Sequence, residues 1–141
     1  MNLQEMKKAL FLLTALLCLM ASCTDNPERS RLTMDKGINL LYNTSRFAEA
    51  EQQFTEAIKY DKNNYEAYYY RGCAKVNQER FDEAILDLQK ALELKPDYAD
   101  AEFTMGRIYF LKEDRDMACY YFKAAMQHGR PNVEDDIKGC P

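Results

Sequence analysis

The sequence predicts an all-α fold, an α-solenoid in which three helical hairpins repeat along the chain. Alanine recurs every 34 residues, at Ala50, Ala84 and Ala118. Apolar residues fall at helical spacing from Leu32 onward, and no stretch alternates as a β-strand does. A fixed period of about 20–50 residues is typical of solenoids, in which each unit buries its apolar face only against its neighbours. The period therefore predicts the fold class. It also predicts a protein whose role is to present a surface rather than to carry out a chemical reaction.

Two further sets of residues share this period, and they are Ala57, Ala91 and Ala125, and Phe54, Leu88 and Phe122. Turn residues divide the chain into six expected helices of about 12–14 residues. We assign them to three units of two helices each, at residues 31–64, 65–98 and 99–132. In residues 132–141, Val133 and Ile137 stand four apart, which predicts a short capping helix that covers the last apolar surface.

The N-terminal segment has the pattern of a secretory signal. Lys7 and Lys8 precede an apolar run from Ala9 to Met20, and small residues follow. The run has about a dozen residues, whereas a membrane-spanning helix needs about 20. We therefore predict a signal peptide at residues 1–22, a flexible polar tether at residues 23–30 and a folded domain at residues 31–141.

The end of this segment, Met20-Ala21-Ser22-Cys23, resembles the lipobox of bacterial lipoproteins, whose cysteine is lipidated and becomes the new N-terminus. That family prefers leucine where Met20 stands. The resemblance implies lipid attachment at Cys23 and a stable anchor in a membrane of the bacterial cell envelope, which we expect to be the outer membrane. Cleavage nearby by an ordinary signal peptidase is the alternative.

The three units resemble tetratricopeptide (TPR) repeats, in which a helix A lies antiparallel to a helix B. The second unit matches best, with Gly72 and Ala84 at the positions where small residues let the helices approach closely. The third unit keeps Gly106. In the first unit glycine comes one residue early, at Gly37, and Ile38 holds the usual glycine position. We therefore expect the first helix pair to splay slightly.

The resemblance also implies a concave groove lined by the A helices. Its positions carry aromatic and polar residues, namely Asn39, Tyr42, Tyr69, Cys73, Asn77, Phe103, Arg107 and Phe110. Aromatic residues and arginine are enriched in binding hot spots. Some of these side chains have packing against the next helix as an alternative role. We expect the groove to bind a protein partner or an extended peptide.

Cochaperone TPR domains clamp a C-terminal carboxylate with asparagine and basic residues at five fixed positions. Here those positions hold Asp35, Asn39, Tyr70, Asp100 and Thr104. Only Asn39 matches, and two acidic residues replace cations. The resemblance therefore implies that a chaperone tail is not the ligand.

After Cys23 the chain contains Cys73, Cys119 and Cys140, and these three predict one disulfide and one thiol. If the cap runs back along the last helix at about 1.5 Å per residue, Cys140 returns to the level of Cys119. Similar short exported TPR proteins often end with a cysteine, which also fits a Cys119–Cys140 bond. Two unpaired thiols are the alternative. Cys73 is interpreted as a small groove residue rather than a reactive thiol.

No motif indicates catalysis or a cofactor, and the scattered cysteines predict no metal site. His128 precedes Gly129 and is interpreted as a helix end, while Glu83 and Asp87 are interpreted as a solvated face. The net charge of −4 and the lack of a basic patch exclude nucleic acid. We predict a non-enzymatic adaptor or scaffold of the envelope. The alternatives are a structural protein that self-associates through its repeat ends and an enzyme or redox factor working through Cys73.

Overall fold

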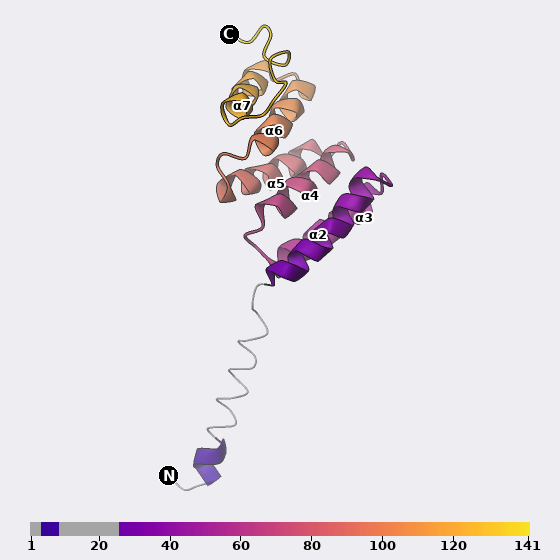
Figure 1. Ribbon diagram of the computed structural model, residues 1–141, viewed down its shortest axis with the longest axis vertical. Helices are drawn as coiled ribbons and strands as arrows, with labels where there is room; N and C mark the ends of the chain where they lie inside the picture. The colour runs from indigo at the N-terminus through magenta and orange to yellow at the C-terminus, as the bar shows by residue number, and fades with distance from the viewer. Residues whose placement is uncertain (1–3, 9–25) are drawn as a thin grey trace.

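The computed structural model describes residues 4–8 and 26–141 of the chain. From residue 26 onward the described part forms six helices, which are α2 (Pro27–Tyr42), α3 (Phe47–Tyr60), α4 (Tyr65–Val76), α5 (Phe81–Leu94), α6 (Ala99–Leu111) and α7 (Arg115–Gln127). Residues 4–8 form one further short helical stretch. Figure 1 shows the six helices stacked as three hairpins along the long axis of the molecule. The described residues contain no β-strand, so the predicted all-α solenoid of three repeats is confirmed.

The array is curved, because its two layers of helices are spaced differently. The first helix of each hairpin, α2, α4 or α6, is called helix A, and the second, α3, α5 or α7, is called helix B. Successive A helices contact one another, at α2–α4 and α4–α6, whereas successive B helices in the described part do not. The A helices therefore line the inner, concave face of the array.

The residues that define the 34-residue period form the core. Ala50 and Ala84 are completely buried, and Ala118 is almost so. Each lies on a B helix where that helix meets its neighbours. Larger residues from the same helices, such as Phe54, fill the remaining space. The period is thus a packing requirement, because a side chain larger than alanine would push the helices apart.

The first hairpin is closed by Gly37, so the expectation that Ile38 would splay it is wrong. A Cβ atom placed on Gly37 would lie 2.6 Å from Cε1 of Phe54. The turn after α2 contains one extra residue: the Arg46 N–H donates to the Leu40 carbonyl, six residues back, where the Arg80 N–H reaches only five residues back. This extra residue moves the register of α2 by one position and brings Gly37 to the close contact.

The first helix begins earlier than the sequence predicted. Residues 27–30, which we had assigned to the flexible tether, form the first turn of α2. The Asn26 side chain caps this turn by accepting from the Arg29 N–H at 3.0 Å, and Pro27 suits the first helical position. The Ser30 hydroxyl donates to the Ala57 carbonyl at 2.9 Å, which ties the turn to α3. The lipobox with Cys23, and most of the predicted signal peptide, lie outside the described residues.

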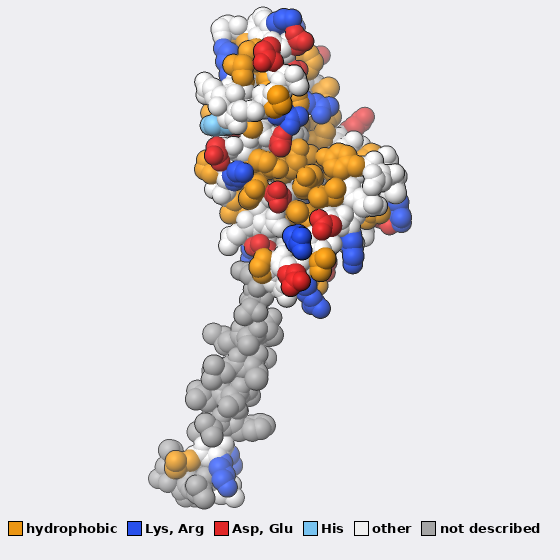
Figure 2. Space-filling view, viewed as in Figure 1, with side chains coloured by type: hydrophobic (Ala, Val, Ile, Leu, Met, Phe, Trp, Pro, Cys, Tyr) orange, Lys and Arg blue, Asp and Glu red, His pale blue; other side chains and the backbone are white. Residues whose placement is uncertain are grey.

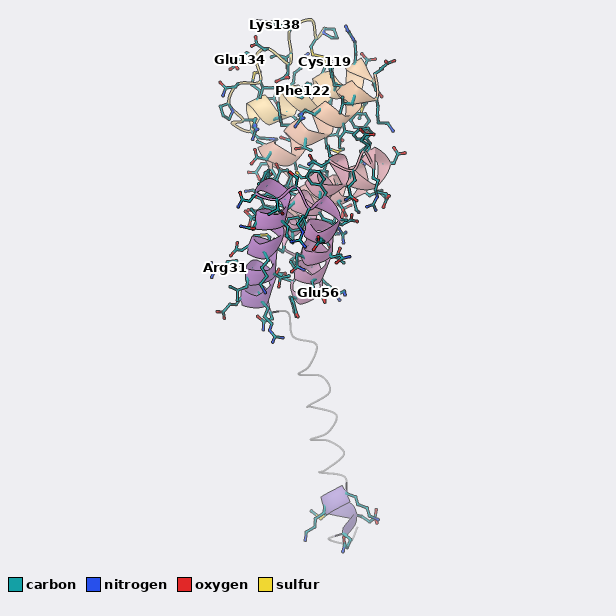
Figure 3. The ribbon with its side chains drawn as sticks, turned by 90° about the vertical axis from the view of Figure 1, so that its right-hand side faces the viewer. Arg31, Glu56, Cys119, Phe122, Glu134 and Lys138 are labelled. Atoms are coloured by element: carbon teal, nitrogen blue, oxygen red, sulfur yellow. A yellow bond between two sulfur atoms is a disulfide. The ribbon has the colours of Figure 1, made fainter. Side chains whose placement is uncertain are left out.

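The C-terminal cap covers the end of the array, but it is not a helix. Residues 134–139 form consecutive turns, and most of their backbone hydrogen bonds span three residues, as from Cys140 to Ile137. Asn132 and Gly139 have positive φ angles of 60° and 87°, which a continuous helix does not allow. Val133 is fully buried against the last hairpin. Figure 3 shows this segment folded over α7, beside Cys119 and Phe122.

Candidate binding groove

Five tyrosines from the first two repeats meet along the A-helix face of the array. We call them the tyrosine cluster, and they are Tyr42, Tyr65, Tyr69, Tyr70 and Tyr98. Neighbouring rings pack edge to face, with ring centroids 5.0 to 6.4 Å apart. Such contacts hold aromatic rings in fixed orientations. Figure 2 shows hydrophobic side chains gathered over the middle of the array, with charged groups around them.

Local helix geometry explains how these rings come together. Tyr65 and Tyr69 lie one turn apart on α4, so their side chains share a face. Tyr98 immediately precedes α6 and contacts both rings. The Lys95 ammonium lies 4.8 Å from the Tyr65 ring centroid and 5.2 Å from that of Tyr98, in the range of cation–π attraction. Tyr42, at the end of α2, is 61% exposed and offers the most accessible ring of the cluster.

Cys73 lies one turn after Tyr69 and is a free, partly buried thiol. Burial raises the pKa of Cys73 to about 11, although hydrogen bonds with Tyr69 and Thr104 and the positive charge of Arg107 act in the opposite direction. At neutral pH the thiol is therefore protonated. This agrees with the interpretation of Cys73 as a packing residue rather than a nucleophile.

Four of the eight predicted groove residues lie together. Tyr42, Tyr69 and Cys73 interact with one another, and Arg107 interacts electrostatically with Cys73. These residues come from α2, α4 and α6, one A helix of each repeat. The structure thus brings the predicted residues of three repeats to one face.

Phe103 and Phe110 lie further along the concave face, beside the C-terminal cap. They line a cavity of about 400 Å³ together with Arg107, Leu111, Phe122 and residues of the cap. The Phe103 ring centroid is 5.5 Å from that of Phe122, and the Arg130 guanidinium lies 4.7 Å from the Phe103 ring. Phe110 is 59% exposed. These two phenylalanines therefore belong to a separate hollow rather than to the tyrosine cluster.

The two predicted asparagines do not join either group. The register shift of α2 puts Ile38, one residue after Gly37, at the position that Cys73 and Arg107 hold in the later repeats. Asn39 is exposed and lies about 100° further around the helix. The Asn77 amide donates to the Cys73 carbonyl at 2.8 Å and so helps to end α4.

A buried ion network behind the groove was missed by the sequence analysis. Asp87 on α5 is only 5% exposed, so its interpretation as part of a solvated face is wrong. It accepts from the Arg71 Nε at 2.9 Å and from the Lys75 Nζ at 2.7 Å, both on α4. Arg71 also donates to the Thr55 hydroxyl on α3 at 3.3 Å. The network fixes α4, the helix that carries most of the tyrosine cluster, between its two neighbours.

His128 ends α7, and Gly129 after it has a φ of 89°, as expected for the turn. The sequence analysis placed no acid beside this histidine. In the structure its Nδ1 lies 2.8 Å from Oε2 of Glu102, a carboxylate on α6 that is 6% exposed. The pair joins the two helices of the last hairpin. Only the folded chain brings these residues together, since they are 26 positions apart.

The structure joins Cys119 and Cys140 in a disulfide, the pair that the sequence analysis favoured. Their Cα atoms are 5.6 Å apart. The bond holds the end of the cap to α7. Within residues 4–8 and 26–141, no cluster of three or more histidine, cysteine, aspartate or glutamate residues is arranged to hold a metal ion. None of the helices described here is long and apolar enough to cross a membrane.

A curved array of paired helices with a solvent-accessible inner face defines the class of helical-repeat proteins. The family model of the tetratricopeptide repeat matches residues 36–99 and 71–131, together more than half of the chain. The chain therefore belongs to the tetratricopeptide repeat family.

Curated relatives include Hsp70-Hsp90 organizing protein 1 of Glycine max, 26% identical over 117 residues, and Hsp70-Hsp90 organizing protein 3 of Arabidopsis thaliana, 27% identical over 117 residues. Each match covers 82% of this chain but only 20% and 21% of the relatives, so the chain spans about a fifth of their length.

Among solved structures, the first TPR domain of Spaghetti bound to an HSP90 peptide superposes with a TM-score of 0.76 at 17% identity, covering 81% of this chain and 91% of that one. The Yersinia enterocolitica type III secretion translocator chaperone SycD gives 0.74 at 12% identity, with the same coverage. At these identities the likeness concerns the fold alone.

Proposed function

We propose that this protein is a non-enzymatic adaptor that binds a protein partner or an extended peptide along its concave face. The observation that carries this proposal is the tyrosine cluster, which together with Arg107 spans three repeats. Tyr42 and Arg107 are exposed there, and aromatic rings with arginine are the residues most often found in binding hot spots. The groove is built by helices, so an extended segment meets a surface that is already formed.

The names of the relatives support a protein ligand in general. The Spaghetti domain is bound to an HSP90 peptide, and the curated relatives are Hsp70-Hsp90 organizing proteins. The residues at the five clamp positions argue against a chaperone tail as the ligand of this chain. With the register shift of α2, the five clamp positions hold Met34, Ile38, Tyr70, Asp100 and Thr104, none of which is basic. A peptide carboxylate would meet no cation there, and the ligand is therefore a different segment.

We further propose that the groove is presented on a lipid-anchored protein of the bacterial envelope, at the outer membrane. The lipobox-like sequence ending at Cys23 supports this anchor. Metabolic labelling with an alkyne-tagged palmitate tests it. The wild-type chain should incorporate the label, and Cys23→Ala should not. Equal labelling of both chains would contradict lipid attachment at this cysteine.

The groove itself is tested by photocrosslinking in cells. A photoreactive amino acid replaces Tyr69 in the tyrosine cluster, or Leu86 as a control. Leu86 lies on α5, a B helix, and is 66% exposed. A partner bound in the groove should crosslink from position 69 and not from position 86. Adducts from position 86 alone would place the partner on the other face of the array.

Self-association is the second candidate function. It is favoured by Leu32, which is 52% exposed on the terminal helix α2 and could meet another copy. Light scattering of the purified protein separates the two candidates. A monomer at micromolar concentration contradicts stacking, whereas a stable oligomer that leaves the tyrosine cluster inaccessible would contradict the adaptor function.

A further inference from the structure

A hollow lies between the last hairpin and the C-terminal cap, at some distance along the chain from the tyrosine cluster. It consists of two cavities of about 230 and 400 Å³, and both are lined by Phe110, Phe122, Asp136 and Lys138. We call it the cap cleft. The smaller cavity is also bounded by the Cys119–Cys140 disulfide, so a covalent bond holds one wall in place.

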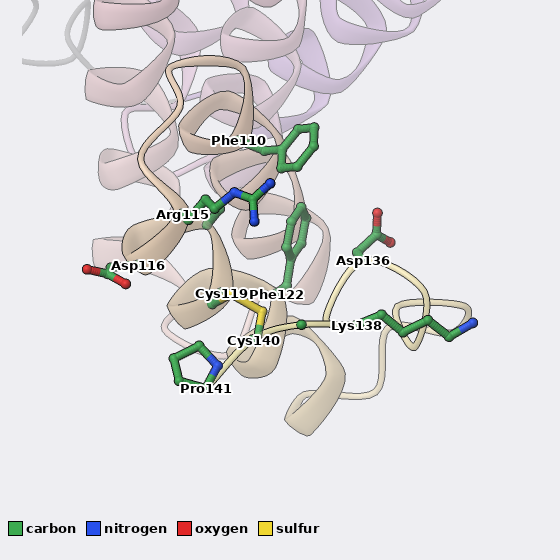
Figure 4. Close-up of a pocket in the computed structure, with 11 residues that line it drawn as sticks. Phe110, Arg115, Asp116, Cys119, Phe122, Asp136, Lys138, Cys140 and Pro141 are labelled. Carbon is green, nitrogen blue, oxygen red and sulfur yellow. A yellow bond between two sulfur atoms is a disulfide. The ribbon is translucent and has the colours of Figure 1, made fainter.

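The walls of the cap cleft combine apolar side chains with charges of both signs, and its arginines stand beside aromatic rings. Figure 4 shows the Arg115 guanidinium extending toward the rings of Phe110 and Phe122, while the Asp116 carboxylate points away from them. Arg107 lines the larger cavity. Among the ion pairs of the described residues, none includes Arg107 or Arg115. Both guanidinium groups can therefore receive an external anion.

The acidic residues of the cleft form no ion pair with these two arginines. Asp135 forms an ion pair with Lys138 inside the cap itself. Asp136 lines both cavities, but it does not lie within ion-pair distance of either arginine in the described structure. An arginine that faces apolar walls binds a carboxylate more strongly than one in open water, because the fork of N–H donors is already oriented and partly shielded from solvent.

We propose that the cap cleft is a second binding site, which accepts a peptide segment with an aromatic or leucine side chain next to an acidic one. The apolar side chain packs against the exposed Phe110 ring, and the neighbouring carboxylate accepts hydrogen bonds from the Arg115 guanidinium. Phe110 is 59% exposed without a ligand, so its burial by such a segment contributes to binding. The site does not use the rings of the tyrosine cluster, although Arg107 borders both sites, and Arg115 belongs to the cap cleft alone.

The test is a selection of random heptapeptides displayed on phage, carried out on the full chain under oxidising conditions. Enriched peptides should combine an acidic residue with an adjacent aromatic residue or leucine. Arg115→Gln should weaken the binding of synthetic copies of these peptides about tenfold, the effect of losing one charge-assisted contact. Arg31→Gln is the matched control, because Arg31 is also exposed but lies at the opposite end of the array, as Figure 3 shows.

Three results would overturn the proposal. The first is a selection that enriches no peptide, and the second is an enriched set without acidic residues. The third is a set of peptides whose affinity falls in Tyr42→Ala but stays unchanged in Arg115→Gln. That last result would support the groove of the tyrosine cluster while removing the cap cleft, so the two sites are judged separately. Arg115 is exposed, and its replacement by glutamine leaves the fold intact.

Discussion

Gly106 and Phe122 lie so close that a Cβ atom on the glycine would be 2.6 Å from Cδ1 of the phenylalanine ring. The same relationship holds between Gly37 and Phe54 in the first hairpin. In the second hairpin Gly72 faces Leu88 instead, and a Cβ atom there would be 3.1 Å from Cγ of the leucine. The three hairpins therefore close around a glycine in each case, but only two of them close against an aromatic ring.

Gly106→Ala should lower the free energy of unfolding by about 1–3 kcal/mol, because the buried Phe122 ring has no room to move away from the added methyl group. Urea denaturation followed by circular dichroism measures this loss. Gly72→Ala is the matched control and should be close to neutral. There the flexible Leu88 side chain can adjust, and alanine favours a helix over glycine by up to about 1 kcal/mol. Equal losses in both variants would contradict the role of the ring.

The backbone repeats the period as well as the core. Ser45, Glu79 and Glu113 stand 34 residues apart and have φ angles of 53°, 59° and 62°, at the turn between helices A and B of each repeat. Glu113→Gly should raise the free energy of unfolding by about 0.5–1 kcal/mol, because glycine adopts this conformation without strain. Asp116→Gly, inside α7, should instead lower it by about 1 kcal/mol. Thermal denaturation measures both changes. Melting temperatures that shift in the same direction in the two variants would contradict this interpretation.

Asp87→Asn should lower the free energy of unfolding by about 3 kcal/mol, because it leaves the ammonium of Lys75 and the guanidinium of Arg71 without a counter-charge in a buried place. Glu83→Gln is the control one turn earlier on α5. Its carboxylate pairs with Arg80 at the surface, and we expect no measurable change from its loss. Chemical denaturation curves that overlap for both variants would show that the buried network contributes nothing.

Alkylation of Cys73 should be slow at pH 8 and should accelerate as the pH rises toward 11. Burial raises the pKa of this thiol to about 11, so the reactive thiolate is scarce below that pH. Arg107→Gln should slow the reaction further, because the positive charge of Arg107 lowers this pKa. Mass spectrometry of iodoacetamide adducts at several pH values gives the rate, and rapid labelling at pH 8 would contradict this environment.

The raised pKa of Cys73 also has a consequence for stability. The unfolded chain releases the thiol proton at a lower pH than the folded chain does. The contribution of this group to the free energy of unfolding is therefore complete below about pH 8 and is lost as the pH rises through 11.

The sequence predicted the repeat and its core because, in every unit, the alanines of the 34-residue period pack against neighbouring helices. Gly37 next to Ile38 was the visible sign of a register shift, but only the turn that ends at Arg46 shows that an extra residue restores the contact. Asp87 could not be assigned in the same way. Its partner Arg71 is 16 positions away, and an acidic residue on an amphipathic helix normally faces water. The cap was predicted in its role but not in its form, because Asn132 and Gly139 stop a helix in so short a segment.

We propose that the tyrosine cluster and Arg107 bind the partner. Isothermal titration of the captured partner with the double variant Tyr42→Ala, Arg107→Ala tests it most directly, since both side chains are exposed and their loss spares the fold. The account predicts a loss of about 2 kcal/mol or more in binding free energy. The double variant Leu86→Ala, Tyr120→Ala, which removes exposed side chains from the B helices, should bind as tightly as the wild type. Undiminished affinity in the first variant, or an equal loss in the second, would contradict a binding site on the concave face.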